Sequence, residues 1–305
     1  MERKQINALL GLPLPELISV ADKVREGCVG SNIELCSIMN AKSGLCAEDC
    51  RFCAQAARHK TGVAAYALKP KEEILEAAKR AKDIGAERFD VVASGDKLSK
   101  EELHRICEAV FEVTTKIGIK MCASLGSLDE ESLLSLKQAG LSRYHHNIET
   151  SSAYFPKIVT THTFQDRIKT IKAAKKIGLQ VCSGGIIGLG ETLTDRVEMA
   201  ICLKELDVDS VPINVLVPIK GTPLEKQDTL SCQEAIRAIA LFRIILKDKI
   251  IKVAAGRESI LKDFQGMAFM AGANGMLIGG YLTIKGREVE EDRKLVEEIK
   301  RLWSK

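Results

Sequence analysis

The chain of 305 residues is long enough for two average domains or for one complete barrel. Its 45 Lys and Arg residues against 41 Asp and Glu residues leave a formal net charge of +4 without runs of like charge, which argues against nucleic acid or a membrane as the partner. A secretory signal pattern and an apolar run of about 18 residues are both missing from the sequence. We therefore expect a cytoplasmic protein that acts on a small molecule.

Short apolar runs alternate with amphipathic helical segments from residue 33 onward, and Gly or Asp marks most of the junctions. Strands are predicted over 33–40, 87–94, 119–126, 143–150, 179–188, 210–218, 250–256 and 275–280. This alternation indicates an α/β fold, a single (βα)8 TIM barrel over 33–285, with an N-terminal helical extension at 1–32 and a C-terminal helix at 286–305. A doubly wound open sheet is the alternative, and it is disfavoured because no Rossmann glycine fingerprint follows the first strand.

Polar side chains share one parity along the predicted strands, where a barrel interior normally holds Val, Ile and Leu. The set is Cys36, Cys122, Cys182, His145, Asn147, Glu149, Ser210 and Asn214. Burying such groups without partners costs roughly 1 to 3 kcal/mol each. The pattern therefore predicts a ligand inside the barrel.

Three cysteines, Cys46, Cys50 and Cys53, follow the first predicted strand in the stretch CAEDCRFC. This position is the carboxyl end of a strand, where barrels place their chemistry. A zinc clip with His59 as fourth ligand is one interpretation. The other is a four-iron cluster with one iron free of protein ligands, and the C-x3-C-x2-C spacing, with the aromatic Phe52 before the last cysteine, is typical of radical S-adenosylmethionine (SAM) enzymes.

Six stretches of the chain together resemble the biotin synthase family, in the same order. They are NAKSGLCAEDCRFCAQ, HHNIETS, VCSGGIIGLGET, SVPINVLVPIKGTP, AAGRES and FMAGAN. The resemblance implies a radical SAM enzyme, a homodimer, that inserts sulfur into dethiobiotin to form biotin and receives electrons from a donor such as flavodoxin or ferredoxin. It also implies that Cys46, Cys50 and Cys53 hold a 4Fe-4S cluster, whose open iron binds SAM.

Further residues match positions of that family around its ligands. By this resemblance, SAM is contacted by Phe52, Asn147, Glu149, Arg167 and Ile186. Dethiobiotin is expected near Lys42, Asn147 and Asn214. For Arg167 an ordinary place on a helix surface is an equal alternative, and for Lys42 a solvated rim position. The glycines of GGIIGLGE are expected to let the backbone approach a ligand, or to form a tight strand-to-helix turn.

The family's auxiliary 2Fe-2S cluster, the sulfur source, is held by three cysteines and an arginine, and this sequence departs from that set. Cys122, Cys182 and Arg257 match, but Asp90 stands where the first cysteine is expected. For Arg257 the alternative to a ligand is a neighbouring charge that balances the thiolates and sulfide. Our hypothesis is that Cys36, Cys122 and Cys182 hold the auxiliary cluster, either 2Fe-2S or larger, with Cys28 as a further candidate and Asp90 as an oxygen ligand or neighbour. Plain buried thiols are the alternative for Cys28 and Cys36.

Other departures keep a second function open. His145, Glu149 and Ala54 replace the family's asparagine, aspartate and proline, and such changes alter discrimination between substrates by about 1 to 3 kcal/mol. A related radical SAM enzyme of the hydrogenase-maturase or amino-acid mutase kind is therefore the alternative function, and a zinc-clipped scaffold protein is the alternative outside enzymes. The remaining histidines His59, His104 and His162 are expected to be surface or packing residues.

Overall fold

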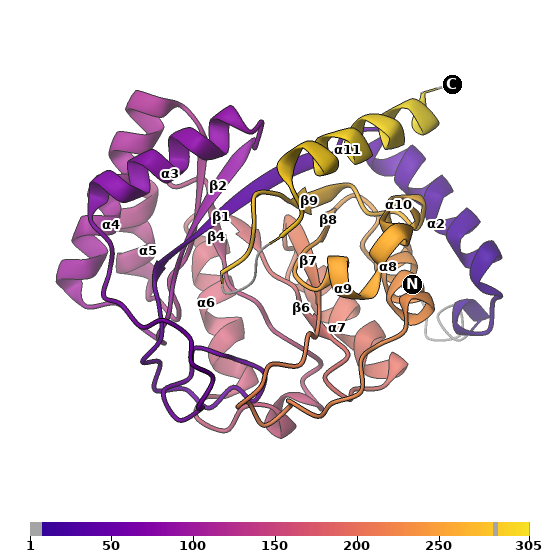
Figure 1. Cartoon of the computed structure of the whole chain (residues 1–305), viewed down its shortest axis with the longest axis horizontal. Helices are drawn as coiled ribbons and strands as arrows, with labels where there is room; N and C mark the ends of the chain where they lie inside the picture. Colours follow the sequence, from indigo (N-terminus) through magenta and orange to yellow (C-terminus); the bar gives the residue numbers. More distant parts are fainter. Residues whose placement is uncertain (1–7, 283–285, 305) are drawn as a thin grey trace.

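A computed structural model describes residues 8–282 and 286–304 of the chain. It has one parallel sheet that closes into a barrel and is surrounded by helices (Figure 1). The strands are β1 (Glu34–Lys42), β2 (Arg88–Ala93), β3 (Lys120–Ser124), β4 (Arg143–His145), β5 (Gln180–Cys182), β6 (Gly185–Ile187), β7 (Ser210–Val215), β8 (Ile250–Val253) and β9 (Gly275–Leu277). Each strand lies in one of the predicted segments or overlaps it, so the predicted barrel is confirmed.

The order of strands in the sheet is β5-β4-β3-β2-β1-β9-β8-β7-β6, and β5 also pairs with β7. That last pairing, Cys182 with Ser210, closes the barrel. The single strand predicted at 179–188 is split into β5 and β6 at Ser183 and Gly184. A Cβ atom on Gly184 would lie 2.0 Å from the Pro212 carbonyl oxygen, and one on Gly185 would lie 2.2 Å from the Glu149 carbonyl oxygen. These two glycines therefore let neighbouring strands close up, and what crowds them is protein backbone.

The helices are α2 (Leu14–Val29), α3 (Lys71–Asp83), α4 (Lys100–Glu112), α5 (Glu130–Gln138), α6 (Phe164–Lys176), α7 (Leu193–Glu205), α8 (Cys232–Leu246), α9 (Arg257–Ile260), α10 (Gln265–Met270) and α11 (Val289–Trp303). Short helical turns are η1 (Val113–Ile117), η2 (Phe155–Lys157) and η3 (Lys262–Phe264). Capping boxes begin α4, α6, α7 and α8, each with Ser or Thr followed three residues later by Glu or Asp. Because each box satisfies free N–H groups of the first turn, these starts are encoded locally.

The predicted N-terminal extension is helix α2, which packs on the outer side of α8 (Figure 1). This cover explains why α8 is buried along nearly its whole length from Ala235 to Leu246. Helix α11 forms the predicted C-terminal helix and crosses the end of the molecule drawn at the top of Figure 1. Residues 1–7, 283–285 and 305, which include the predicted barrel boundary at 285, lie outside the described residues.

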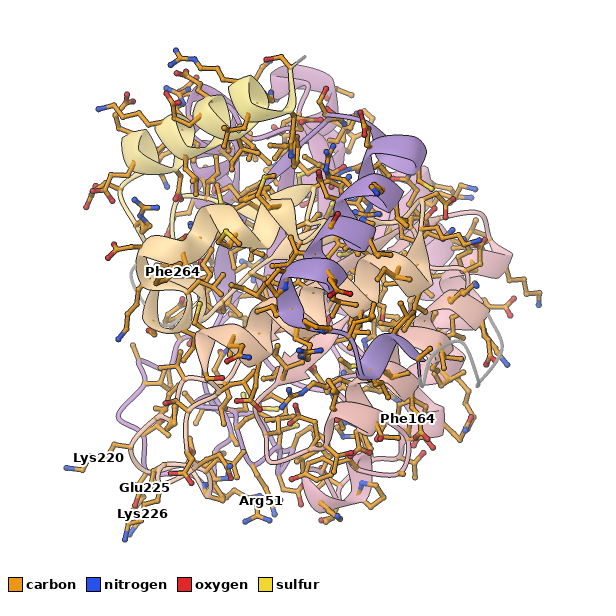
Figure 2. The ribbon with its side chains drawn as sticks, turned by 90° about the vertical axis from the view of Figure 1, so that its right-hand side faces the viewer. Arg51, Phe164, Lys220, Glu225, Lys226 and Phe264 are labelled. Atoms are coloured by element: carbon orange, nitrogen blue, oxygen red, sulfur yellow. The ribbon has the colours of Figure 1, made fainter. Side chains whose placement is uncertain are left out.

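The longest loops gather at the opposite end, at the carboxyl ends of the strands, where Figure 1 shows segments 43–69 and 216–231 below the barrel. Figure 2 shows Arg51 of the first loop and Lys220 and Glu225 of the second at this same end. The two loops touch, since a Cβ atom on Gly221 would lie 2.2 Å from the Lys60 carbonyl oxygen. Within the described residues, no helix combines the length and the apolar character that crossing a bilayer requires.

Candidate active site

A cavity of about 390 Å³ runs from these loops into the barrel. Its mouth is lined by Cys46, Cys50 and Cys53, together with Glu48, Phe52, His162 and Arg167. Its interior is lined by Cys36, Cys122 and Cys182, together with Arg88, Asp90, Arg143, His145 and Lys252. The structure thus brings two separate sets of three cysteines to one cavity. The interior set is the one that the predicted strand parity directs into the barrel. Ser210 is buried but is not among the lining residues.

The thiol loop, residues 46–53, is held in place from outside the cavity. The Asp49 carboxylate accepts hydrogen bonds from the Thr160 and Thr161 amides at 2.8 and 3.2 Å, and the Arg51 amide donates to the Ile158 carbonyl at 3.0 Å. Within the loop, the Cys53 amide donates to the Cys50 carbonyl at 2.9 Å. The loop is therefore ordered by its docking on residues 158–161.

Burial raises the pKa of the Cys50 and Cys53 thiols, so a positively charged partner is needed to keep their thiolates. The described residues contain no group of three or more His, Cys, Asp or Glu side chains arranged around one ion. An iron–sulfur cluster needs no such arrangement, because each thiolate binds a different iron atom. His59, the fourth ligand of the zinc interpretation, lies with Nδ1 2.9 Å from the Cys53 carbonyl oxygen and does not line the cavity.

Next to the thiol loop, Arg167 and Glu149 bring opposite charges to the cavity wall. The Arg167 Nη1 atom donates to the Asn147 carbonyl at 3.1 Å and lies 3.8 Å from Glu149 Oε1. The alternative of a surface position for Arg167 is wrong, since its side chain is only 15% exposed. Burial raises the pKa of Glu149, and its backbone adopts a φ of 67°, which is uncommon for a residue other than glycine. Such a conformation is held by the surrounding structure, here by the Ile186 amide bonded to the Glu149 carbonyl at 2.8 Å.

A second cavity, of about 210 Å³, adjoins the first. Phe52, Asn214, Ala255 and Tyr281 line both cavities, and Ile186 lines the second. Its other walls include residues 215–217 and 255–256. The structure therefore brings Phe52, Ile186 and Asn214 together around a space suited to a flat, partly apolar group.

Inside the barrel, the three cysteines stand next to charged groups. The Lys252 ammonium lies 2.9 Å from Cys36 Sγ, and burial raises the pKa of Cys36 to about 11. Asp90 pairs in register with Cys122 on the neighbouring strand. The Asp90 carboxylate lies 2.9 Å from His145 Nδ1 and forms a hydrogen bond with it. Burial lowers the pKa of His145, but the nearby Cys182 and the bond to Asp90 outweigh it and raise this pKa to about 9.

One buried carboxylate, Glu34, accepts hydrogen bonds from three cations below the cysteines. Arg88 Nε lies at 2.8 Å, Arg143 Nη1 at 2.7 Å and Lys252 Nζ at 2.9 Å. Burial alone would raise the pKa of Glu34, but Lys252 and Arg143 lower it far below its ordinary value. Counting these three cations against Glu34 and Asp90 leaves one positive charge in excess, before His145 is considered.

Two buried atoms at this end, Asp90 Oδ1 and Arg143 Nε, have no hydrogen-bond partner among the described residues. Such groups are costly unless a ligand satisfies them. Three thiolates that hold an iron–sulfur cluster would be anionic, and they would offset the excess positive charge. The interior therefore fits an auxiliary cluster.

Three predicted residues lie elsewhere. Arg257 does not line the cavity, because its guanidinium is buried against Asp292 at 2.6 Å and Tyr281 at 3.0 Å; its assignment as a cluster ligand is wrong. Cys28 lies exposed on α2, outside the barrel, so it cannot serve the interior. Lys42 forms an ion pair with Glu102 of α4 at 2.7 Å and is not among the lining residues.

Several lining residues were missed by sequence reasoning. Arg88, Arg143 and Lys252 line the cavity, and Glu34 binds all three without lining it. All four were missed because charged residues inside a barrel are unusual, although each shares the inward parity or flanks it. His162 was expected at the surface or in packing, but it lines the cavity mouth. A usable signal for Lys252 was a single lysine within the apolar run IIKVAA.

Comparison with family models places the chain in a class of enzymes. Residues 42–203 match the radical SAM superfamily, which covers more than half of the chain and contains the thiol loop. Two solved structures share the fold. Methylornithine synthase is 24% identical with a TM-score of 0.84, and the match covers 99% of this chain and 93% of that one. The FeFe-hydrogenase maturase HydG from Carboxydothermus hydrogenoformans is 18% identical with a TM-score of 0.81, and the match covers 95% of this chain and 72% of that one. The chain is a radical SAM barrel enzyme.

Sequence relatives define the family more closely. Biotin synthase from Thermotoga neapolitana is 54% identical over 89% of this chain and 98% of its own length, and that from Thermotoga petrophila is 49% identical over 98% and 99%. Residues 212–300 match the Biotin and Thiamin Synthesis associated domain. The chain belongs to the biotin synthase family. Its cofactors are accordingly a 4Fe-4S cluster, SAM and an auxiliary iron–sulfur cluster, and the zinc-clipped scaffold is excluded.

Proposed function

We propose that this enzyme inserts sulfur between two saturated carbons of dethiobiotin to form biotin, and that the two cysteine sets of the cavity divide the work. The observation that carries this proposal is the single cavity that joins Cys46, Cys50 and Cys53 at its mouth to Cys36, Cys122 and Cys182 in its interior. A substrate seated between the two levels has a hydrogen-abstracting group on one side and a sulfur source on the other.

At the mouth, the three loop cysteines would hold the 4Fe-4S cluster, and SAM would bind beside it. Bound together, these two cofactors supply a carbon radical able to remove hydrogen from an unactivated C–H bond. Arg167 offers donors to the carboxylate of SAM, and Asn147 and Glu149 offer polar contacts to its ribose. Phe52 and Ile186 give the second cavity a surface on which adenine can pack.

In the interior, Cys36, Cys122 and Cys182 hold the auxiliary cluster, of the 2Fe-2S kind or larger. Asp90, with one unpartnered oxygen among the described residues, serves as an oxygen ligand or a close neighbour. Lys252, and not Arg257, provides the positive charge beside the thiolates, because its ammonium lies 2.9 Å from Cys36 Sγ. This arrangement keeps the sulfur source away from the cavity mouth and from bulk water.

The substrate lies between these groups. Asn214 and Asn147 are the amide side chains that a ureido ring can bond, although in this structure Asn214 is bonded to the Gly185 carbonyl at 3.1 Å. Lys42 would have to leave Glu102 to meet the carboxylate of the substrate. A homodimer, a cytoplasmic location and an electron donor such as flavodoxin or ferredoxin complete the proposal.

The test is anaerobic reconstitution with iron and sulfide, followed by turnover with dethiobiotin and measurement of both 5'-deoxyadenosine and biotin. We expect both products from the unaltered enzyme and from the control Cys107→Ala on α4. Cys122→Ala should produce 5'-deoxyadenosine without biotin. If the unaltered enzyme itself, loaded with both clusters, makes 5'-deoxyadenosine and no biotin, the function is that of a related radical SAM enzyme with another small substrate.

A further inference from the structure

We propose that His162 is a positioning residue, which holds the Arg167 guanidinium toward the cavity by connecting it to Glu48 of the thiol loop. All three side chains line the mouth of the cavity. The inference rests on the role proposed above for Arg167, the binding of the SAM carboxylate. It adds a residue to that site which no sequence motif indicated.

The hydrogen bonds fix the direction of this connection. Arg167 Nε donates to His162 Nε2 at 3.1 Å, and an arginine has no acceptor, so the proton of the neutral imidazole lies on Nδ1. His162 Nδ1 in turn donates to Glu48 Oε2. The imidazole is therefore an acceptor on one side and a donor on the other, an arrangement that orients both charged partners.

The His162 ring is itself held in place. It packs edge-on against Phe155, with ring centroids 5.7 Å apart and an angle of 66° between the planes. Its side chain is 11% exposed, so water has little access with which to replace either hydrogen bond. The imidazole is therefore a fixed link.

Without the hydrogen bond to His162, few contacts would hold the Arg167 guanidinium in its orientation. Its remaining contacts are the Asn147 carbonyl at 3.1 Å and the Glu149 carboxylate at 3.8 Å, both through Nη1. Nε would lose its acceptor, and rotation of the guanidinium would become easier. An arginine that binds a carboxylate through two parallel donors depends on that orientation.

The connection also joins two parts of the site that are far apart in sequence. Glu48 lies in the thiol loop between Cys46 and Cys50, whereas His162 lies two residues before α6 and Arg167 in the first turn of that helix. The loop docks on the same segment through Asp49, which accepts from the Thr160 amide at 2.8 Å. These contacts thereby fix the position of Arg167, the residue proposed to bind the SAM carboxylate, relative to the cluster-binding loop.

The experiment titrates SAM into the reduced 4Fe-4S enzyme and follows the change in the electron paramagnetic resonance spectrum. For His162→Ala we expect about tenfold weaker SAM binding, the effect of losing one hydrogen bond to a charged group, and a raised KM for SAM with a smaller change in kcat. His162→Gln, which keeps an acceptor and a donor, should recover most of the affinity. The control is His104→Ala on α4, whose side chain is 75% exposed.

Two further variants separate this inference from the role of Arg167. Arg167→Ala should weaken SAM binding at least as much as His162→Ala, and the double variant should be little worse than Arg167→Ala alone. If Arg167→Ala binds SAM normally, the proposed role of Arg167 fails. If Arg167→Ala weakens binding and His162→Ala does not, or if His162→Gln is as weak as His162→Ala, the positioning role of His162 is refuted. Iron content and thermal unfolding of each variant report any loss of the loop itself.

Discussion

Replacing Glu34 with Gln removes the one carboxylate that pairs with three buried cations at the inner end of the barrel. The side chain is 8% exposed and accepts from Arg88, Arg143 and Lys252 at 2.7 to 2.9 Å. Glutamine has nearly the same size and keeps one acceptor oxygen, so packing is preserved and charge is not. The variant therefore isolates the electrostatic part of this interaction.

The expected loss of stability is large. Breaking a buried ion pair by removing one partner costs about 3 to 5 kcal/mol, because the other charge stays buried without compensation. In Glu34→Gln three cations lose their common partner, while the retained oxygen still accepts one bond. We therefore expect the free energy of unfolding to fall by about 4 kcal/mol. Lys252→Met should cost less, since it leaves Glu34 with two of its three partners.

Urea unfolding of the cluster-free protein, followed by circular dichroism, measures this effect. The matched control is Glu130→Gln, which breaks an ion pair of 2.8 Å with Lys176 at the surface, where the Glu130 and Lys176 side chains are 49% and 70% exposed. The expected loss in the free energy of unfolding is below about 1 kcal/mol. If Glu34→Gln is no more destabilising than Glu130→Gln, the interior charges are not the tightly coupled, dry cluster that we describe.

Three other variants test separate parts of the structure. Cys36→Ala should lower the auxiliary iron and sulfide content while 5'-deoxyadenosine formation continues, and unchanged iron with unchanged biotin yield would refute the ligand assignment. Arg257→Met removes the 2.6 Å partner of the buried Asp292 and leaves it only the longer ion pair with Arg287 at 3.9 Å, so the free energy of unfolding in urea should fall by about 3 kcal/mol. The auxiliary iron content should stay normal, and loss of that iron without loss of stability would restore Arg257 as a ligand. Gly184→Ala places a Cβ 2.0 Å from the Pro212 carbonyl oxygen, so the free energy of unfolding should fall by about 1 to 3 kcal/mol and the midpoint of thermal unfolding should fall with it. An unchanged midpoint of thermal unfolding would show that the strands β5 and β7 are not closely packed where they close the barrel.

The barrel could be predicted from sequence because its signals are local. Apolar runs alternate with amphipathic helices, and capping boxes such as Ser99 with Glu102 mark where helices begin. The division of residues 179–188 into two strands could not be predicted, because it depends on contact of Gly184 and Gly185 with backbone from other strands. Local patterns contain no information about such distant contacts.

The site was predictable where side-chain alternation along a strand applies. Cys36, Cys122 and Cys182 share the inward parity, and the structure places all three in the cavity. Arg257 was misplaced because it follows the last strand residue by several positions, so alternation no longer fixes its direction; the inward cation of this segment is Lys252, within β8. His162 was missed because its role depends on a loop docked from more than a hundred residues away in the sequence.

Electron paramagnetic resonance of the anaerobically reconstituted protein, reduced with dithionite and titrated with SAM, tests the central claim most directly. We expect a reduced 4Fe-4S signal that changes when SAM is added and that is lost in Cys50→Ala. Absence of a paramagnetic signal from the fully metallated, reduced protein, with a metal other than iron found by elemental analysis, would contradict the assignment of the thiol loop and the chemistry built on it.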